Sequence, residues 1–211
     1  MKNIVERDTK KEILKVATKQ FAQKGYDGTS IREVCRIAGV NVALISYYWG
    51  SKKELFNGAV NNLIENQTRY AKSALDFAIN PDDLSKKEQI DLMYRTVDKA
   101  IEFFYSDMSS ELLTILTHGQ KEKEIFENLP LFRYGKKLFA ALFNLKENDK
   151  QVILTLVSII TLINAPRLMP NFSLQLMNQR TFHQEDVKII RKNVRTYMNA
   201  LLKEHNLMHK C

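Results

Sequence analysis

The sequence predicts an all-α protein of about nine helices, on three observations. Its 211 residues include only seven Gly and four Pro, which leaves few turns and favours long helices. Apolar residues recur at steps of three and four, and no stretch alternates with period two for long enough to indicate a strand. A helix-start signal, Ser or Thr followed three residues later by Glu or Gln, begins at Thr9, Ser30, Ser51, Ser85 and Thr181.

Four helices are expected in the N-terminal part, over residues 9–24, 31–38, 42–48 and 52–78. In the first, Ile13, Ala17 and Phe21 form one apolar stripe, and Gly25 follows it as a stop signal. The third helix can be capped by Asn41. The fourth ends before the pair formed by Asn80 and Pro81.

Five further helices are expected over residues 86–106, 109–118, 122–144, 149–164 and 184–204. Pro130 lies inside the helix expected over residues 122–144 and can kink or split it. The segment 164–184 is long for a connection and apolar for a loop, so it is either a lid, a short helix or a surface loop packed on the core.

Composition and charge limit the class of protein. The chain carries 32 Lys and Arg against 24 Asp and Glu, a formal charge of +8 that suits an anionic partner. Hydrophobic content of 45% indicates an ordinary soluble domain and excludes a collagen-like or largely disordered chain. Cys35 and Cys211 cannot form a disulfide framework, and no signal peptide is apparent, so we expect a cytoplasmic protein. The apolar run Val152–Ile163 is too short to span a bilayer, and no membrane partner is expected.

The segment from Ser30 to Trp49 has helix-turn-helix spacing. One short helix ends at Gly39, and a turn of three residues leads into a second short helix that Ile45 can anchor. Residues 1–60 hold 11 Lys or Arg against 6 Asp or Glu, so positive charge is concentrated around this motif. A short helix presented in this way fits the major groove of DNA.

The residue types in this segment suggest how it would contact DNA. Val42, Ala43 and Leu44 have no hydrogen-bonding side chains and suit thymine methyl groups, whereas Arg32 suits a guanine edge. Tyr47, Tyr48 and Lys52 would hold phosphates. The candidate DNA-binding residues are Ser30, Arg32, Asn41, Val42, Ala43, Leu44, Ser46, Tyr47, Tyr48 and Lys52. Tyr48 and Trp49 fit a core role equally well, Arg32 can also be a solvated charge, and Cys35 is read as a small buried residue.

Thirteen positions in residues 9–60 stand at the spacings of one known motif. They are Phe21, Gly25, Tyr26, Thr29, Ser30, Ile31, Gly39, Val40, Ile45, Tyr48, Lys52, Leu55 and Phe56. On these residues the chain resembles a TetR-family (tetracycline-repressor-type) transcriptional regulator. It departs from the family pattern at Ala43–Ser46 and at Trp49, so no operator sequence is carried over from other members.

The resemblance implies two domains, a DNA-binding domain over residues 1–51 and a helical effector-binding and dimerisation domain over residues 52–211. It also implies a homodimer that binds a palindromic double-stranded operator, acts more often as a repressor than as an activator, and is released by an unknown small-molecule effector. Two apolar stretches occupy the place of the family's dimer helices, and both can instead be core of a single chain. The candidate dimer residues are Leu156, Ile160, Ile163, Val187, Ile190, Val194, Met198 and Leu201.

Aromatic residues between these stretches are candidates for an effector pocket, although aromatic residues at helical spacing are also typical of a core. The candidates are Phe103, Phe104, His118, Phe132, Phe139 and Phe143. The acidic residues Glu102, Asp107 and Glu111 nearby would permit a cationic ligand. No cofactor or metal is expected, because His205, His209 and Cys211 are better explained as a frayed tail.

Two other function classes remain as alternatives. A non-specific DNA-coating protein would use the same basic surface without an effector. A helical enzyme would need its acid, base or nucleophile in the aromatic body, yet the sequence shows no phosphate-binding loop, nucleophile elbow or paired metal-binding His.

Overall fold

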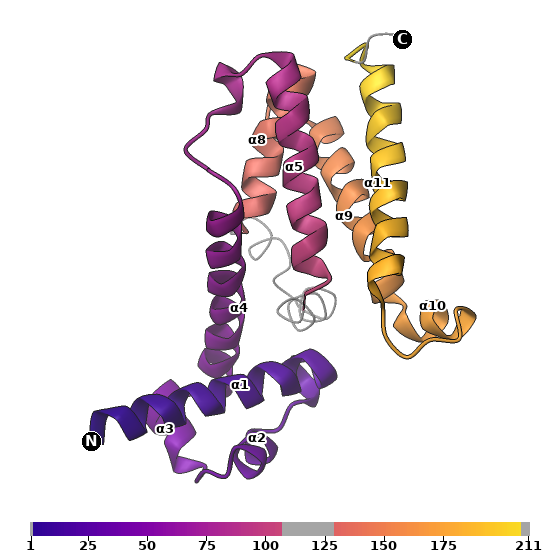
Figure 1. Ribbon diagram of the computed structural model, residues 1–211. Helices are drawn as coiled ribbons and strands as arrows, with labels where there is room; N and C mark the ends of the chain where they lie inside the picture. The colour runs from indigo at the N-terminus through magenta and orange to yellow at the C-terminus, as the bar shows by residue number, and fades with distance from the viewer. Residues whose placement is uncertain (1, 107–128, 208–211) are drawn as a thin grey trace. The chain divides into compact units, whose positions relative to one another are not determined.

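Helices and turns make up the whole described part of the chain, which confirms the all-α prediction (Figure 1). The computed structural model describes residues 2–106 and 129–207. They divide into two compact units, one that ends at Gln67 and one that begins at Thr68. The change from one unit to the other falls inside the helix α4 (Lys52–Ala74), whereas the domain limit expected from the sequence lies between residues 51 and 52.

The N-terminal unit consists of three helices and the first part of α4. The three are α1 (Lys2–Gly28), α2 (Ile31–Ala38) and α3 (Ala43–Trp49). Its core side chains include Ile13, Ala17, Phe21, Val34, Cys35, Ile45, Leu55 and Ala59. Phe21 meets the edge of Phe56 at 5.1 Å between ring centroids, which joins α1 to α4. Each helix of the unit is thus held by a buried apolar face.

The corner between α1 and α2 depends on Gly25. This residue has φ +71°, a left-handed value that L side chains rarely adopt, and it kinks the end of α1. The hydroxyl of buried Thr29 donates to the Gly25 carbonyl at 2.7 Å and satisfies it. The predicted start of α1 at Thr9 is wrong, because no Gly or Pro interrupts residues 2–8 and the helix continues back to Lys2.

The C-terminal unit is built around one apolar core shared by four helices. They are α5 (Lys86–Phe104), α8 (Pro130–Phe143), α9 (Lys150–Leu168) and α11 (Gln184–Glu204). Helix α5 packs on α8, α8 on α9, α9 on α11 and α11 on α5, so the four helices enclose the core. Between α4 and α5, the short turn η1 (Pro81–Asp83) packs on α8.

Several predicted boundaries in this unit change for local reasons. Helix α4 ends at Ala74 instead of residue 78, and the Asp76 carboxylate then accepts from the Ala78 amide at 2.9 Å in the following turn. Pro130 is the first residue of α8, so the part of the expected helix that the structure describes begins at this proline. The predicted helix over residues 109–118, and residues 122–128 of the next one, lie outside the described residues.

The segment that follows α9 is helical for part of its length. Helix α9 continues through Pro166 to Leu168, past its predicted end at residue 164. A short helix, α10 (Pro170–Leu176), occupies the middle of the segment for which the sequence left lid, short helix and loop open. The Ser173 hydroxyl donates to the Pro166 carbonyl at 2.6 Å and ties α10 to the end of α9.

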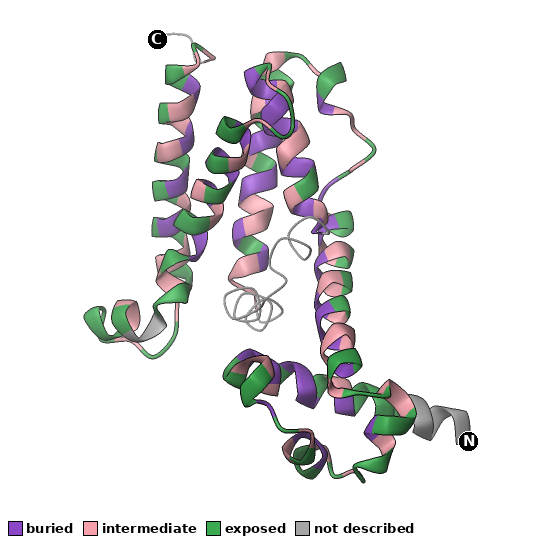
Figure 2. Cartoon of the chain, turned by 180° about the vertical axis from the view of Figure 1, so that it is seen from behind, coloured by how far each residue is buried: buried purple, intermediate pink, exposed green. Residues whose placement is uncertain are grey.

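Helix α9 is apolar on both of its faces. Val152, Leu156, Ile159 and Ile163 are buried in the core, and exposed apolar residues follow the opposite face (Figure 2). By length and composition alone, α9 is the one helix of the described residues that meets the requirements for crossing a membrane. One face of α9 packs into the core of the C-terminal unit, and the opposite face is exposed in this single chain.

Candidate nucleic-acid interface

The turn between α2 and α3 has the geometry of a helix-turn-helix motif. Gly39 adopts the left-handed conformation at the end of α2, with φ +66°. The amide of Val40 donates to the Cys35 carbonyl at 3.0 Å. The side-chain oxygen of Asn41 accepts from the Ala43 amide at 2.8 Å, so Asn41 caps α3 as predicted. The turn is therefore fixed at both of its ends.

Helix α3 has one buried anchor and a largely exposed outer face. Ile45 is 2% exposed, whereas Val42 is 44% and Tyr47 is 71% exposed. Ala43 and Ser46 are exposed too, and Leu44 is half-buried. Tyr47 packs edge-on against Tyr48, with 4.9 Å between ring centroids. Large apolar or aromatic side chains that gather in solvent mark an interaction site on a protein surface. Here they lie together on α3 and at its N-cap.

Two candidates on α2 are accessible. Arg32 and Ser30 are both exposed, and the Ser30 hydroxyl makes no cap hydrogen bond to α2. The predicted partner of Ser30 in that cap, Glu33, instead accepts from Lys24 of α1 at 2.7 Å. This hydrogen bond lowers the pKa of the Glu33 carboxyl. The pair holds α2 against α1 and leaves Ser30 and Arg32 available.

Lys52, expected as a phosphate contact, is half-buried at the start of α4. Its ammonium group lies 4.6 Å from the centroid of the Tyr26 ring and 3.4 Å from the Asp27 carbonyl. The Ser51 hydroxyl accepts from the Glu54 amide at 3.1 Å, which confirms the helix-start signal there. Lys52 thus joins the start of α4 to the end of α1 and keeps a positive charge beside the first turn of α4.

Trp49, left open between core and surface, packs on α4. It is half-buried, and Lys10 lies 4.7 Å from the centroid of its ring. A methyl group at Gly58 would come within 2.2 Å of the indole. Only glycine therefore leaves room for the indole at this contact between α3 and α4.

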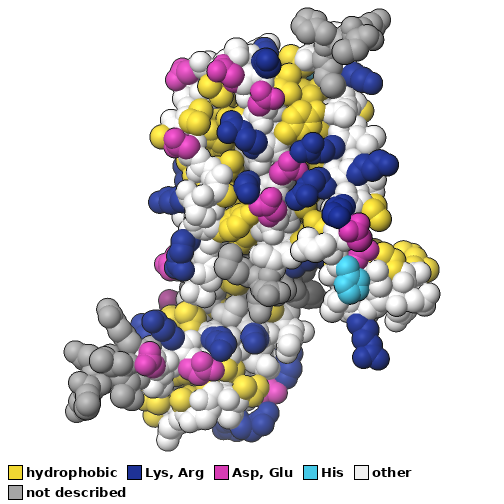
Figure 3. Space-filling view, viewed as in Figure 1, with side chains coloured by type: hydrophobic (Ala, Val, Ile, Leu, Met, Phe, Trp, Pro, Cys, Tyr) yellow, Lys and Arg dark blue, Asp and Glu magenta, His cyan; other side chains and the backbone are white. Residues whose placement is uncertain are grey.

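Lys and Arg side chains lie over both units on this face of the chain, and acidic side chains lie among them (Figure 3). A hollow of about 230 Å³ between α1 and α4 has Lys11, Lys15 and Lys19 in its wall. No group of three or more His, Cys, Asp or Glu side chains that could hold a metal ion occurs among the described residues. Of the tail residues considered for a metal, His205 stacks on Phe143 at 4.2 Å, whereas His209 and Cys211 lie outside the described residues.

The aromatic residues proposed for an effector pocket are mostly core. Phe103, Phe139 and Phe143 are 1%, 2% and 8% exposed and belong to the apolar cluster of the C-terminal unit. Phe104 and Phe132 are half-buried and pack against the same cluster. His118 lies outside the described residues.

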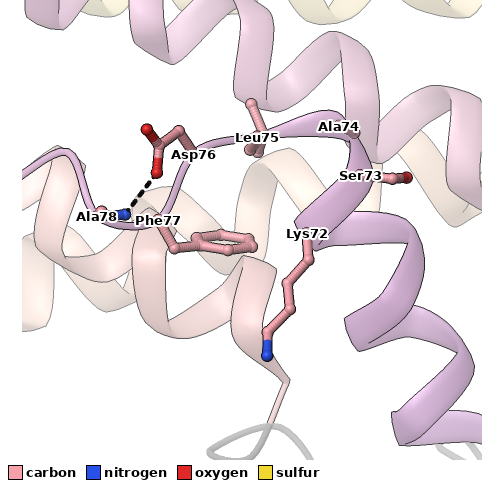
Figure 4. A pocket seen from close by; sticks show the side chains of 7 residues that line it. All are labelled: Lys72, Ser73, Ala74, Leu75, Asp76, Phe77 and Ala78. Atoms are coloured by element: carbon pink, nitrogen blue, oxygen red, sulfur yellow. Dashed lines mark hydrogen bonds between the residues drawn. The ribbon is translucent and has the colours of Figure 1, made fainter.

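A hollow of about 500 Å³ lies at the end of α4 (Figure 4). A single stretch of chain lines it, from Lys72 to Ala78. The Asp76 carboxylate there is already hydrogen-bonded to the Ala78 amide. None of the five effector-pocket candidates that the structure describes lines this hollow.

The candidate dimer residues divide into two groups. Five of them are buried inside this chain, namely Leu156, Ile163, Ile190, Val194 and Met198. Ile160, Val187 and Leu201 are half-buried. Exposed apolar residues of these two helices are Leu154, Val157, Leu162 and Leu168 of α9 and Ile189 of α11. The helical spacing of these residues in the sequence could have indicated this second apolar stripe. The prediction missed it because the buried stripe of the same helices has the same spacing.

Comparisons with known proteins fit this geometry. Residues 13–59 match the family model described as "Bacterial regulatory proteins, tetR family". The probable HTH-type transcriptional regulator YttP of Bacillus subtilis (strain 168) is 34% identical over 130 residues, which is 56% of this chain and 61% of that relative. The transcriptional dual regulator CecR of Shigella flexneri is 27% identical over 206 residues, 92% of this chain and 91% of that protein.

A similar fold is found among solved structures. A TetR-like transcriptional regulator from Rhodococcus sp. RHA1 matches with a TM-score of 0.58 and 14% identity, over 90% of this chain and 96% of that one. The matching family and these relatives are transcriptional regulators, not enzymes.

Proposed function

Because this chain belongs to the tetR family of bacterial transcriptional regulators, we propose that it is a cytoplasmic, homodimeric repressor that binds a palindromic operator and releases it when a small molecule binds the C-terminal unit. The observation that carries this proposal is the exposed face of α3, where Val42, Ser46 and Tyr47 project around the buried anchor Ile45.

Base recognition is assigned to α3 and to Arg32. Val42 and Ala43 present methyl groups suited to thymine, and the Arg32 guanidinium can donate two parallel hydrogen bonds to a guanine. Leu44 is half-buried, so it contributes through the edge of its side chain. Asn41 acts by fixing the turn, because its oxygen already accepts from the Ala43 amide.

Phosphate contacts are assigned to polar groups around this helix. Ser30, Ser46, Tyr47 and Tyr48 offer hydroxyl groups, and Lys52 offers its charge beside the first turn of α4. Contacts of this kind fix the register on the duplex and make affinity depend on salt.

The homodimer is assigned to the outer faces of α9 and α11. Leu154, Val157 and Leu162 are exposed on α9, and Ile189 is exposed on α11. Contiguous exposed apolar residues mark interaction sites in soluble proteins. A twofold dimer presents two copies of α3, so the operator it reads is palindromic.

Selection of duplexes from a random pool, followed by titration of the enriched sequence, tests this proposal. We expect a palindromic consensus that the protein prefers over random duplex by a factor on the order of 10³ at physiological salt. Arg32→Ala should lower operator affinity by roughly 10- to 100-fold with the fold unchanged. Arg95→Ala, which removes an exposed arginine from the C-terminal unit, is the matched control and should change it little.

A non-specific DNA-coating protein gives a different result. It would enrich no sequence, and Arg32→Ala and Arg95→Ala would weaken binding equally, through lost charge alone.

A further inference from the structure

Arg167, in the last turn of α9, is a half-buried charge without a carboxylate partner among the described residues. Its Nη1 lies 3.5 Å from the side-chain oxygen of Asn164, at the limit of a hydrogen bond. The centre of its guanidinium group lies 5.5 Å from the centroid of the Tyr105 ring. These contacts leave most of its five N–H donors unused by the described protein.

Other arginines of the same unit are placed differently. Arg191 and Arg195 of α11 pair with Asp98 of α5, at 3.3 Å and 2.5 Å. Burial lowers the pKa of the Arg167 side chain, and the neighbouring Tyr105 acts in the opposite direction. The C-terminal dipole of α9 favours a cation in its last turn, but only by a fraction of what a paired anion gives.

The neighbours of Arg167 hold it in place and surround it with apolar surface. The Tyr105 hydroxyl donates to the Ile163 carbonyl at 2.9 Å, and burial raises the pKa of Tyr105 to about 12, so this donor stays protonated. Asn164 is 1% exposed and donates to the Ile160 carbonyl at 2.9 Å. The Phe182 ring meets the edge of Tyr105 at 5.7 Å. A fixed cation beside aromatic side chains suits a molecule with one anionic group and an apolar body.

The partners of Glu102 disfavour the cationic ligand considered from the sequence. Glu102 accepts from Lys99 at 2.7 Å and from Tyr70 at 3.3 Å, and Arg191 lies 3.9 Å away. Its charge is therefore already neutralised. The remaining two acidic residues, Asp107 and Glu111, lie outside the described residues.

We propose that Arg167 is the anion-binding residue of the effector site, and that the effector is an organic anion whose carboxylate, sulfonate or phosphate accepts from the guanidinium while its apolar part lies against Tyr105 and Phe182. The inference rests on the proposed function, because it names the class of molecule that the C-terminal unit binds. The planar guanidinium fork matches such oxyanions with two parallel hydrogen bonds.

Calorimetry with matched probes tests the site on the full-length protein in 0.15 M salt, without DNA. The first set is 2-naphthoate, 2-naphthylmethanol and 2-naphthylmethylammonium, and a second set with the ten-carbon chains decanoate, decanol and decylammonium covers an aliphatic body. We expect at least one carboxylate to bind tenfold or more tightly than its alcohol and its ammonium. Arg167→Met should remove this preference and leave alcohol binding unchanged, and Arg167→Lys should retain part of it.

A control separates this site from general attraction to a basic protein. Arg180→Met removes an exposed arginine from the same unit and should leave the preference intact. Equal binding of carboxylate and alcohol in both sets, or an unchanged preference in Arg167→Met, overturns the proposal. Circular dichroism of each variant establishes that it is folded.

The outcome is independent of the operator experiment. A protein that selects an operator but shows no carboxylate preference overturns the anion site and leaves the repressor proposal standing. A protein that binds the carboxylate through Arg167 but selects no operator supports the anion site and overturns the repressor proposal.

Discussion

The N-terminal unit exposes side chains that a globular protein normally buries, and the C-terminal unit buries a charge that a globular protein normally exposes. Tyr47 on α3 and Val42 at its N-cap are 71% and 44% exposed, whereas Arg167 at the end of α9 is half-buried without an acidic partner among the described residues. Other large apolar side chains are buried in both units; Phe21 and Phe103, for example, are each 1% exposed. A residue is therefore informative about function when its surroundings do not suit its chemistry.

Aromatic truncation in the two units provides the largest test of this contrast. Phe103→Ala should lower the free energy of unfolding by about 3–5 kcal/mol, because it removes a ring from the packed core. Tyr47→Ala should change it by less than about 0.5 kcal/mol, and should instead weaken operator binding. Urea unfolding at one protein concentration measures both effects. A stability loss for Tyr47→Ala as large as that for Phe103→Ala would mean that Tyr47 is a structural residue.

The contact between α3 and α4 gives a second test, with a smaller expected change in the free energy of unfolding. Alanine at position 58 would place a methyl group 2.2 Å from the Trp49 ring, so Gly58→Ala should cost about 1–3 kcal/mol of overpacking strain. Trp49 is the single tryptophan of the chain, and its fluorescence should report the displaced ring.

Replacing Trp49 with the smaller ring of phenylalanine should reverse the sign of the stability change caused by Gly58→Ala. In a Trp49→Phe background the same Gly58→Ala change should be neutral or stabilising by up to about 1 kcal/mol, since alanine is the better helix former. Equal destabilisation in both backgrounds would show that the indole is not the cause.

Local signals in the sequence predicted the N-terminal unit well. The bounds of α2 agree with the structure, Asn41 caps α3, and Cys35 is buried, because each depends on neighbours within a few residues. The helix-start signals succeeded where the chain was otherwise free to begin a helix, as at Ser85, whose amide and hydroxyl contact Glu88. At Ser30 the signal failed because Glu33 pairs with Lys24.

The candidate sites of the C-terminal unit could not be predicted in the same way. Whether an aromatic residue lines a pocket or fills a core depends on which helices surround it, and periodicity alone does not distinguish these cases. The same limit applies to α9, where the sequence shows an apolar helix but not which stripe faces inward. Arg167 has no sequence signal, because the absence of a partner is a property of the folded unit.

The ion-paired carboxylate of Glu102 in the C-terminal unit provides the test with the smallest expected effect, the dependence of stability on pH. The hydrogen bond from Lys99 lowers the pKa of Glu102 below its ordinary value, with Tyr70 and Arg191 acting in the same direction and burial opposing them. A carboxyl group whose pKa is lower in the folded state stabilises the fold above its unfolded pKa, and this stabilisation is lost as the pH falls through the folded pKa. Because Glu102 is 43% exposed, solvent screening limits its contribution to less than about 1 kcal/mol. Glu102→Gln should therefore lower stability slightly at pH 7, and the difference should shrink as the pH falls through the lowered pKa of Glu102, in urea titrations of both proteins from neutral to acidic pH. A stability difference that stays constant with pH would assign the effect to packing instead of charge, and Glu102 would then give no electrostatic reason to disfavour a cationic ligand.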